Sequence, residues 1–137
     1  MAVADDLTKP QIIDRSAPIC RDLLDAIQPH IENLEDATSK GEWDRVIREG
    51  HRAIDASRPF GRELRRLRPE TGARRYGRFL DHARMALDWL EQSLDALEEE
   101  RIDLAKSRRR TAQHHFARAK RAARRYGLSR PCIKVVS

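Results

Sequence analysis

The amino-acid sequence predicts an all-α protein, an antiparallel four-helix bundle built from two helical hairpins. Glycine and proline are sparse, with six of each in 137 residues. Ala, Leu, Arg and Glu dominate, and these residue types favour helix. Apolar residues recur every three or four positions in four segments, which is typical of helices with one buried face. The length suffices for one hydrophobic core, so we expect a single domain over residues 1–137 that ends in a short tail at residues 128–137.

The first helix is expected to begin near Ser16, after loosely ordered residues 1–13, and to tolerate Pro18 in its first turn. Pro29 interrupts the apolar pattern, which predicts a kink or a short break at that point. A turn at residues 39–41 ends the helix. Its apolar face consists of Ile19, Leu23, Ile27, Ile31 and Leu34.

The second helix is expected to open at residues 42–44, where acidic side chains suit the positive end of the helix dipole. The helical period continues through Pro59, so a kink is expected there as well. Pro69 ends the helix. Its inner face is formed by Val46, Ile47, Gly50, Ala53, Ile54, Ser57, Phe60, Leu64 and Leu67.

The third helix is predicted to start near Thr71, whose hydroxyl can cap it. The fourth helix is predicted from Ile102 to Tyr126, and Gly127 ends it. The third helix has the most regular apolar face of the chain, which comprises Tyr76, Phe79, Leu80, Ala83, Leu87, Leu90, Leu94 and Leu97.

One continuous helix is an alternative to the third and fourth helices, because no glycine or proline lies between Gly72 and Gly127. We favour a turn near Glu98–Arg101. The apolar period jumps by five residues from Leu97 to Ile102, which breaks the face that a single helix would present.

Charged residues fall in alternating blocks, although the net charge is only +6. Residues 61–80 hold seven basic and two acidic residues, and residues 106–137 hold eleven basic and no acidic residues. In an up-down-up-down bundle, the end of the second helix, the start of the third and the end of the fourth share one end. We call this end the basic pole, and it comprises Arg62, Arg65, Arg66, Arg68, Arg74, Arg75, Arg78, Lys120, Arg121, Arg124 and Arg125.

The opposite end of the predicted bundle collects acidic side chains. We call it the acidic pole, and it comprises Glu32, Glu35, Asp36, Glu42, Asp44, Asp95, Glu98, Glu99, Glu100 and Asp103. This layout favours a non-enzymatic interaction module whose basic pole binds an acidic protein partner or a second copy of the chain. Trp43, Met85 and Trp89 are further candidate contact residues, because Trp and Met are enriched at the centres of interfaces.

An alternative function is nucleic-acid or other polyanion binding through the same arginines, since guanidinium groups form bidentate pairs with phosphate. Only Tyr76 and Tyr126 interleave with the basic residues as aromatic groups that could stack on bases. The sequence contains no helix-turn-helix or zinc-finger signature. An acidic protein partner is therefore the leading prediction.

The sequence predicts no catalytic residue, no metal site and no cofactor. It contains no nucleophile paired with a base and no glycine-rich phosphate loop. The histidines show neither Glu-x-x-His nor His-x-x-x-His spacing. They are His30, His51, His82, His114 and His115.

Cys20 and Cys132 lack the CxxC spacing of metal and redox sites. The predicted bundle places both cysteines at the basic pole, which allows a disulfide worth about 4–5 kcal/mol in the chain-entropy model. The alternative is two reduced thiols in a cytosolic protein, with Cys20 buried as a small apolar residue.

The sequence contains no apolar run of about 18 residues, so no membrane span is expected. Residues 1–6 lack the cationic start and apolar run of a signal peptide. We therefore expect a cytoplasmic protein on the chain as given, or an extracytoplasmic one if an export signal has been removed.

A few short motifs suggest a relationship. The chain contains Cys20 together with a Gly127-Leu128-x-x-Pro131-Cys132 motif. Phe79-Leu80 opens a long helix, and Asp103-Leu104-Ala105 opens the last one. In these features the chain resembles small helical proteins of actinobacteria, many of which are exported or lipid-anchored. The resemblance implies an all-α bundle and a disulfide between the two cysteines, and it assigns no functional residue.

Overall fold

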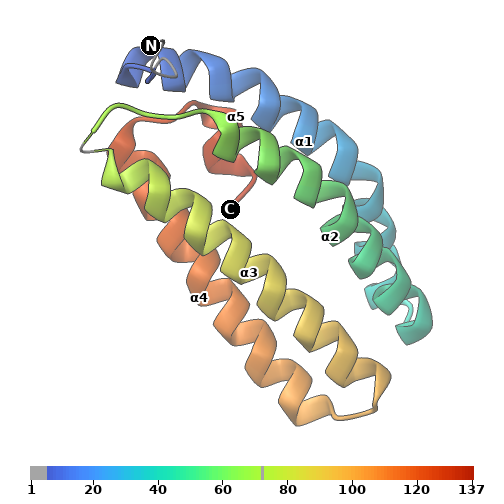
Figure 1. The fold of residues 1–137 in the computed structure, drawn as a ribbon. Coiled ribbons are helices and arrows are strands. Elements are labelled where there is room, and N and C mark those ends of the chain that lie inside the picture. Colours follow the sequence, from blue (N-terminus) through green and yellow to red (C-terminus); the bar gives the residue numbers. More distant parts are fainter. Residues whose placement is uncertain (1–5, 72) are drawn as a thin grey trace.

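The computed structural model describes residues 6–71 and 73–137 as an all-α bundle of two helical hairpins, as predicted (Figure 1). The described residues contain no β-strand, only an isolated bridge between Leu7 and Pro69. The helices in chain order are α1 (Lys9–Ser39), α2 (Trp43–Arg66), α3 (Arg74–Glu98), α4 (Ile102–Tyr126) and α5 (Arg130–Lys134). None of these helices is both long and apolar enough to cross a membrane.

Helix α1 begins earlier than predicted because Thr8 and Gln11 form a capping box. The Thr8 hydroxyl accepts a hydrogen bond from the Gln11 backbone N–H, and the Gln11 side chain accepts one from the Thr8 N–H, at 3.3 and 2.9 Å. These bonds satisfy two amides that a helix start otherwise leaves without acceptors. The prediction of loose structure is therefore wrong for residues 9–13, whereas residues 1–5 lie outside the described chain.

Helices α1 and α2 run through their internal prolines without interruption, so the short break considered at Pro29 does not occur. Pro18, Pro29 and Pro59 are all solvent-exposed. A proline in a helix leaves the carbonyl four residues earlier without its usual donor, and on an exposed face water can take that place.

The start of α3 differs from the prediction, since Thr71 does not cap it. The helix starts at Arg74, and its N-cap position is Ala73, which has no side chain able to cap. The preceding segment is held extended by Leu7, whose N–H donates to Arg68 O and whose carbonyl accepts from Glu70 N–H. Because this pairing keeps residues 68–70 extended, α3 begins only after them, at Arg74.

Both ends of α4 agree with the sequence. The chain turns at residues 99–101, which separates α3 from α4 and excludes one continuous helix. Gly127 ends α4 in the left-handed conformation, with φ of 88°, and its N–H donates to Ala123 O. Glycine adopts this conformation without the steric cost that a Cβ would add.

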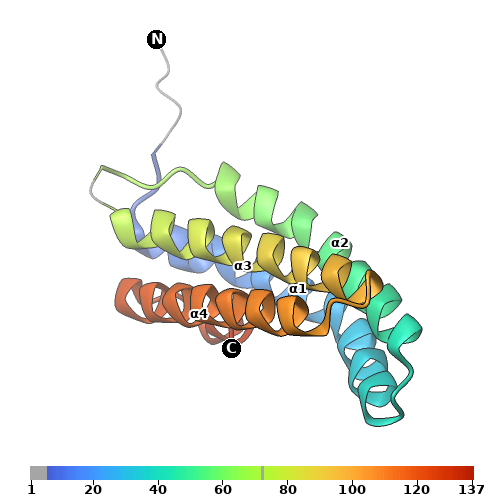
Figure 2. The ribbon, with the colours of Figure 1, turned by 90° about the horizontal axis from the view of Figure 1, so that it is seen from below.

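Neighbouring helices in the chain pack on one another, α1 on α2, α2 on α3 and α3 on α4 (Figures 1 and 2). The prediction of a mere tail at residues 128–137 is wrong, because this segment contains the short helix α5, which packs against both α1 and α4 at the end where α1 begins. The main hydrophobic core also lies at this end, opposite the connecting turns. Its buried members are Leu7, Ile12, Cys20, Leu64, Tyr76, Phe79, Leu80, Ala119, Ala122, Ala123, Tyr126, Leu128, Cys132 and Val136.

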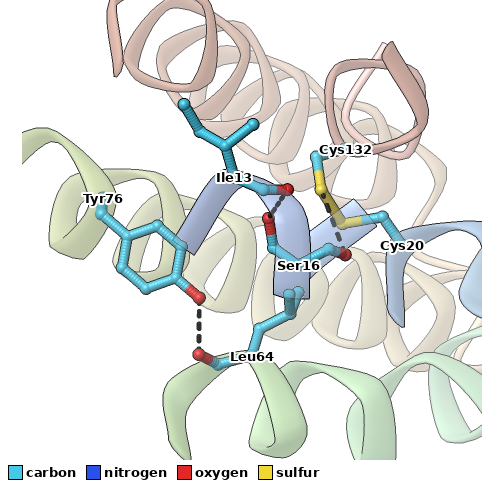
Figure 3. The surroundings of a disulfide bond; sticks show 6 residues. All are labelled: Ile13, Ser16, Cys20, Leu64, Tyr76 and Cys132. Carbon is cyan, nitrogen blue, oxygen red and sulfur yellow. Dashed lines mark hydrogen bonds between the residues drawn. A yellow bond between two sulfur atoms is a disulfide. The ribbon is translucent and has the colours of Figure 1, made fainter. Parts of the chain in front are cut away.

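Cys20 of α1 and Cys132 of α5 are fully buried in this core, and their sulfur atoms lie at disulfide-bonding distance (Figure 3). Their Cα atoms are 5.0 Å apart, within the range that a disulfide spans. The Cys132 sulfur lies 3.6 Å from the carbonyl oxygen of Ser16, whose hydroxyl donates to the Ile13 carbonyl. The pair fastens α5 to α1 beside the basic pole.

Candidate functional site

The eleven residues of the basic pole lie on the last turns of α2, the segment that follows it, the first turns of α3 and the last turns of α4. Ten of their side chains are exposed, and Lys120 is partly buried. Figure 1 shows these helix ends at the end of the molecule that carries α5, away from the connecting turns.

Few of these cations have a carboxylate partner. Arg65 pairs with Asp81 at 3.1 Å, and in the described part of the chain none of the other ten has a carboxylate within 4.0 Å. Elsewhere on the surface some arginines are paired, whereas others, among them Arg109 and Arg110, have no carboxylate partner in the described chain. The paired ones include Arg45 with Asp36, Arg52 with Glu49, and Arg58 with Asp88 and Glu91. Positive charge at the basic pole is therefore almost uncompensated by ion pairs within the described chain.

A pocket of about 460 Å³ opens at this end, between the start of α1, the start of α3 and the end of α4. We call it the polar pocket. Three basic-pole residues line it, Arg74, Arg75 and Arg78, together with Lys9. Its full lining consists of Lys9, Glu70, Thr71, Ala73, Arg74, Arg75, Arg78 and Tyr126.

Sequence reasoning missed Lys9, because the segment that contains it was expected to be loose. The capping box at Thr8 was the available signal. The structure holds Lys9 in place through the helix start and through the backbone pairing of Leu7 with residues 68–70. Lys9 Nζ lies 5.3 Å from the centroid of the Tyr126 ring, which places the ammonium in cation–π range.

Tyr126 contributes an unusual polar group to the pocket. Tyr126 is only 5% exposed, but its hydroxyl is not sealed from solvent and has no hydrogen-bond partner among residues 6–71 and 73–137. Burial, followed by the negative charge of Glu70, raises the pKa of Tyr126, so the hydroxyl stays protonated. Tyr76, by contrast, uses its hydroxyl inside the core, where it donates to the Leu64 carbonyl (Figure 3).

The remaining basic-pole residues do not line the polar pocket. Four of them lie at the end of α2 and just beyond it, Arg62, Arg65, Arg66 and Arg68, and the other four lie on the last two turns of α4. Tyr76 and Tyr126 are both buried, so neither offers an exposed ring on which a base could stack. The structure thus divides the predicted site into a pocket and two flanking surfaces.

The predicted apolar contact residues differ in exposure. Trp43 at the start of α2 is 54% exposed, whereas Met85 and Trp89 on α3 are partly buried. Ile102 at the start of α4 is 48% exposed and borders a second, shallow pocket of about 550 Å³ at the α3–α4 turn. These exposed apolar side chains lie at the acidic pole, away from the polar pocket.

Two histidine groups form that sequence spacing did not predict. His51 of α2 meets Asp95 and Glu98 of α3, with all three ligand atoms within 4.8 Å of one another. This is the spacing of metal ligands, but Asp95 and Glu98 are exposed. The three residues belong to different helices, so their proximity depends on the register in which α2 packs on α3. Spacing along the sequence does not indicate this register.

The second histidine group lies between α3 and α4. The Nδ1 atoms of His82 and His115 are 3.0 Å apart, and their rings are stacked. Burial lowers the pKa of both side chains, and nearby cationic groups, including Arg118, lower it further. A hydrogen bond at this distance requires that one imidazole donate and the other accept.

Comparison of the chain with family models, with curated proteins and with solved structures finds no match. The resemblance to actinobacterial helical proteins stays a prediction.

Proposed function

We propose that the protein is a non-enzymatic interaction module that binds an acidic protein partner through its basic pole. The observation that supports this proposal is the scarcity of ion pairs at this pole. Ten of its eleven cations have no carboxylate partner in the described chain, and ten of the eleven side chains are exposed. An acidic partner would supply the missing countercharges.

The physical role of such a surface is to select and steer the partner. Exposed cations on helix ends raise the local concentration of an oppositely charged molecule and speed its association, an effect that salt screens over about 8 Å at physiological ionic strength. A second copy of the chain could also serve as partner, since its acidic pole carries the complementary charge.

Nucleic acid is the second candidate, because guanidinium groups bind phosphate oxygens well. Two features favour a protein partner instead. Both tyrosines near the arginines are buried, which removes base stacking. The unpaired cations of the basic pole are also spread over three separate helix ends.

The test compares two double variants of α4 that change net charge equally. Arg124→Glu with Arg125→Glu alters the basic pole, and Arg109→Glu with Arg110→Glu alters exposed arginines nearer the other end of α4. Binding to poly-glutamate is measured by fluorescence anisotropy at low and at physiological salt. We expect the first variant to weaken binding by about tenfold and the second to have a much smaller effect.

Equal losses in the two variants would show that only total charge matters, and would overturn the assignment to the basic pole. Duplex DNA and single-stranded RNA serve as parallel probes. If either binds the unmodified protein more tightly than poly-glutamate at physiological salt, nucleic acid replaces the acidic protein as the proposed partner. Analytical ultracentrifugation of the protein alone tests self-association.

A further inference from the structure

We propose that the polar pocket binds a dianionic phosphate group, either inorganic phosphate or a phosphate monoester carried by the acidic partner. The identity of the carrier rests on the proposed function, whereas phosphate binding in the pocket does not.

The first argument is charge. Lys9, Arg74, Arg75 and Arg78 line the pocket, and none has a carboxylate within 4.0 Å in the part of the chain that the structure describes. Glu70 is the acidic residue in the lining. Four cations against one carboxylate leave an excess of positive charge around a small volume, and a dianion bound there would offset much of their mutual repulsion.

The second argument is the unused donor. The Tyr126 hydroxyl is protonated and has no hydrogen-bond partner among the described residues, and Tyr126 lines the pocket. The hydroxyl is not sealed from solvent, so it is free to bond to a molecule in the pocket. An oxygen of a bound ligand would provide that partner at the inner wall.

The third argument is the start of α3. Its first backbone N–H groups have no acceptor within the helix, and Ala73 at the N-cap supplies no side-chain oxygen to replace one. The partial positive charge of a helix start favours an anion nearby. The arginines at the first two positions of α3 therefore act together with the backbone that carries them.

These donors suit a phosphate better than a carboxylate. Three guanidinium groups, one ammonium and one hydroxyl exceed what two carboxylate oxygens can accept, whereas a phosphate dianion presents three or four acceptor oxygens and twice the charge. The negatively charged carboxylate of Glu70, which also lines the pocket, repels a bound anion. Replacing this carboxylate should therefore tighten binding.

The test is a titration followed by amide chemical shifts in NMR, with inorganic phosphate, phenyl phosphate and benzoate as probes. We expect saturable shifts centred on the start of α3 with both phosphates, and far weaker binding of benzoate. Arg78→Gln should weaken phosphate binding by roughly tenfold and Tyr126→Phe by several-fold, while Glu70→Gln should tighten it. The matched control is Arg121→Gln, which removes the same charge outside the pocket.

The thermal midpoint of Tyr126→Phe separates a ligand role from a structural one. If the hydroxyl is unpaired in the free protein, the midpoint should not fall. Lack of saturation by phosphate, equal binding of benzoate, or an equal loss in Arg121→Gln and Arg78→Gln would overturn the proposal.

A phosphoserine-containing acidic peptide and its unphosphorylated form distinguish the two sources. Binding of the phosphopeptide well above both the plain peptide and inorganic phosphate assigns the phosphate to the partner. Equal affinity for phosphopeptide and inorganic phosphate assigns the pocket to a small phosphate. Phosphate binding without any binding of poly-glutamate would retain the pocket and reject the proposed function.

Discussion

Gly50 lies where α2 comes close to α3. A Cβ built on Gly50 would lie 2.8 Å from Leu94 Cδ1 and 2.9 Å from Leu94 Cδ2, closer than carbon atoms approach without strain. Gly61 belongs to the same helix, and a Cβ there would meet nothing within 4 Å. The two glycines therefore have different surroundings, and only Gly50 lies against a side chain of the facing helix.

Alanine substitution at these two glycines should have different effects. Gly61→Ala should stabilise the protein by about 0.5–1 kcal/mol, because alanine is the better helix former. Gly50→Ala should lose much of this gain because the Leu94 side chain must shift to make room, so it should be the less stable variant by about 1 kcal/mol in urea unfolding. Equal stabilisation by both would contradict close packing of α2 on α3 at this point.

The seam between α3 and α4 contains small buried residues and one titratable pair. Ala105 and Ala112 of α4 are buried, and Ser93 of α3 donates a hydrogen bond to the Ala105 carbonyl. His82 and His115 meet farther along the same seam. Burial is the main cause of their lowered pKa values, and Arg118 and His114 add to it, while Asp81 partly opposes the shift of His82.

Acid should weaken this seam at mild pH. In the unfolded chain both imidazoles titrate near 6.5, and in the folded protein each has a lower pKa, so the unfolded state binds more protons just below pH 6.5. Stability should therefore be full above this window and fall as the pH is lowered through it. Thermal midpoints measured across the window should show the loss.

The control for this pH dependence is the neighbouring histidine. His115→Gln should flatten the pH profile below 6.5, whereas His114→Gln on the exposed side of α4 should largely preserve it. The hydrogen bond to His30 is the main reason that the pKa of Glu49 is lowered from its ordinary value of 4.5. The stability that Glu49 contributes is therefore lost only as the pH falls below 4.5, which separates its pH window from that of the histidines. Identical profiles for both histidine variants would refute the assignment.

The sequence predicted the helices better than their starts. Apolar periodicity located all four long helices, and the jump in period after Leu97 located the turn between α3 and α4. The start of α1 was missed because it depends on a capping box rather than on apolar spacing. The start of α3 was misplaced because a distant residue, Leu7, holds the preceding segment extended.

Only part of the candidate site was predictable, because the sequence shows features along one helix better than contacts between distant segments. Charge blocks and helix order located the basic pole, since both follow from sequence and bundle topology. The polar pocket was not predictable, because it needs Lys9 and Tyr126 from opposite ends of the chain. The group of His51 with Asp95 and Glu98 likewise depends on the register between two helices.

At the scale of the whole molecule, the Cys20–Cys132 pair joins positions 112 residues apart in the sequence. It fastens α5 to α1 inside the main core, next to the basic pole. A crosslink that closes a loop of this length restricts the unfolded chain strongly, by about 5 kcal/mol in the chain-entropy model.

Removing the crosslink should therefore lower stability substantially while leaving the helices in place. Cys20→Ala with Cys132→Ala should reduce the free energy of unfolding in urea by up to about 5 kcal/mol, and a reductant should shift the unmodified protein in the same direction. The double variant should be insensitive to reductant. Two free thiols, found by non-reducing mass spectrometry of protein from an oxidising compartment, would refute the bond.

The same crosslink determines how the protein would respond to a mechanical pull on its two ends. Tension applied there passes through the bond between Cys20 and Cys132, so only the short segments outside it can extend. The helices between the two cysteines bear no load, although they include most of the bundle. Reduction of the bond would let the segment between the two cysteines extend under tension as well, which adds about 380 Å of chain at roughly 3.4 Å per residue.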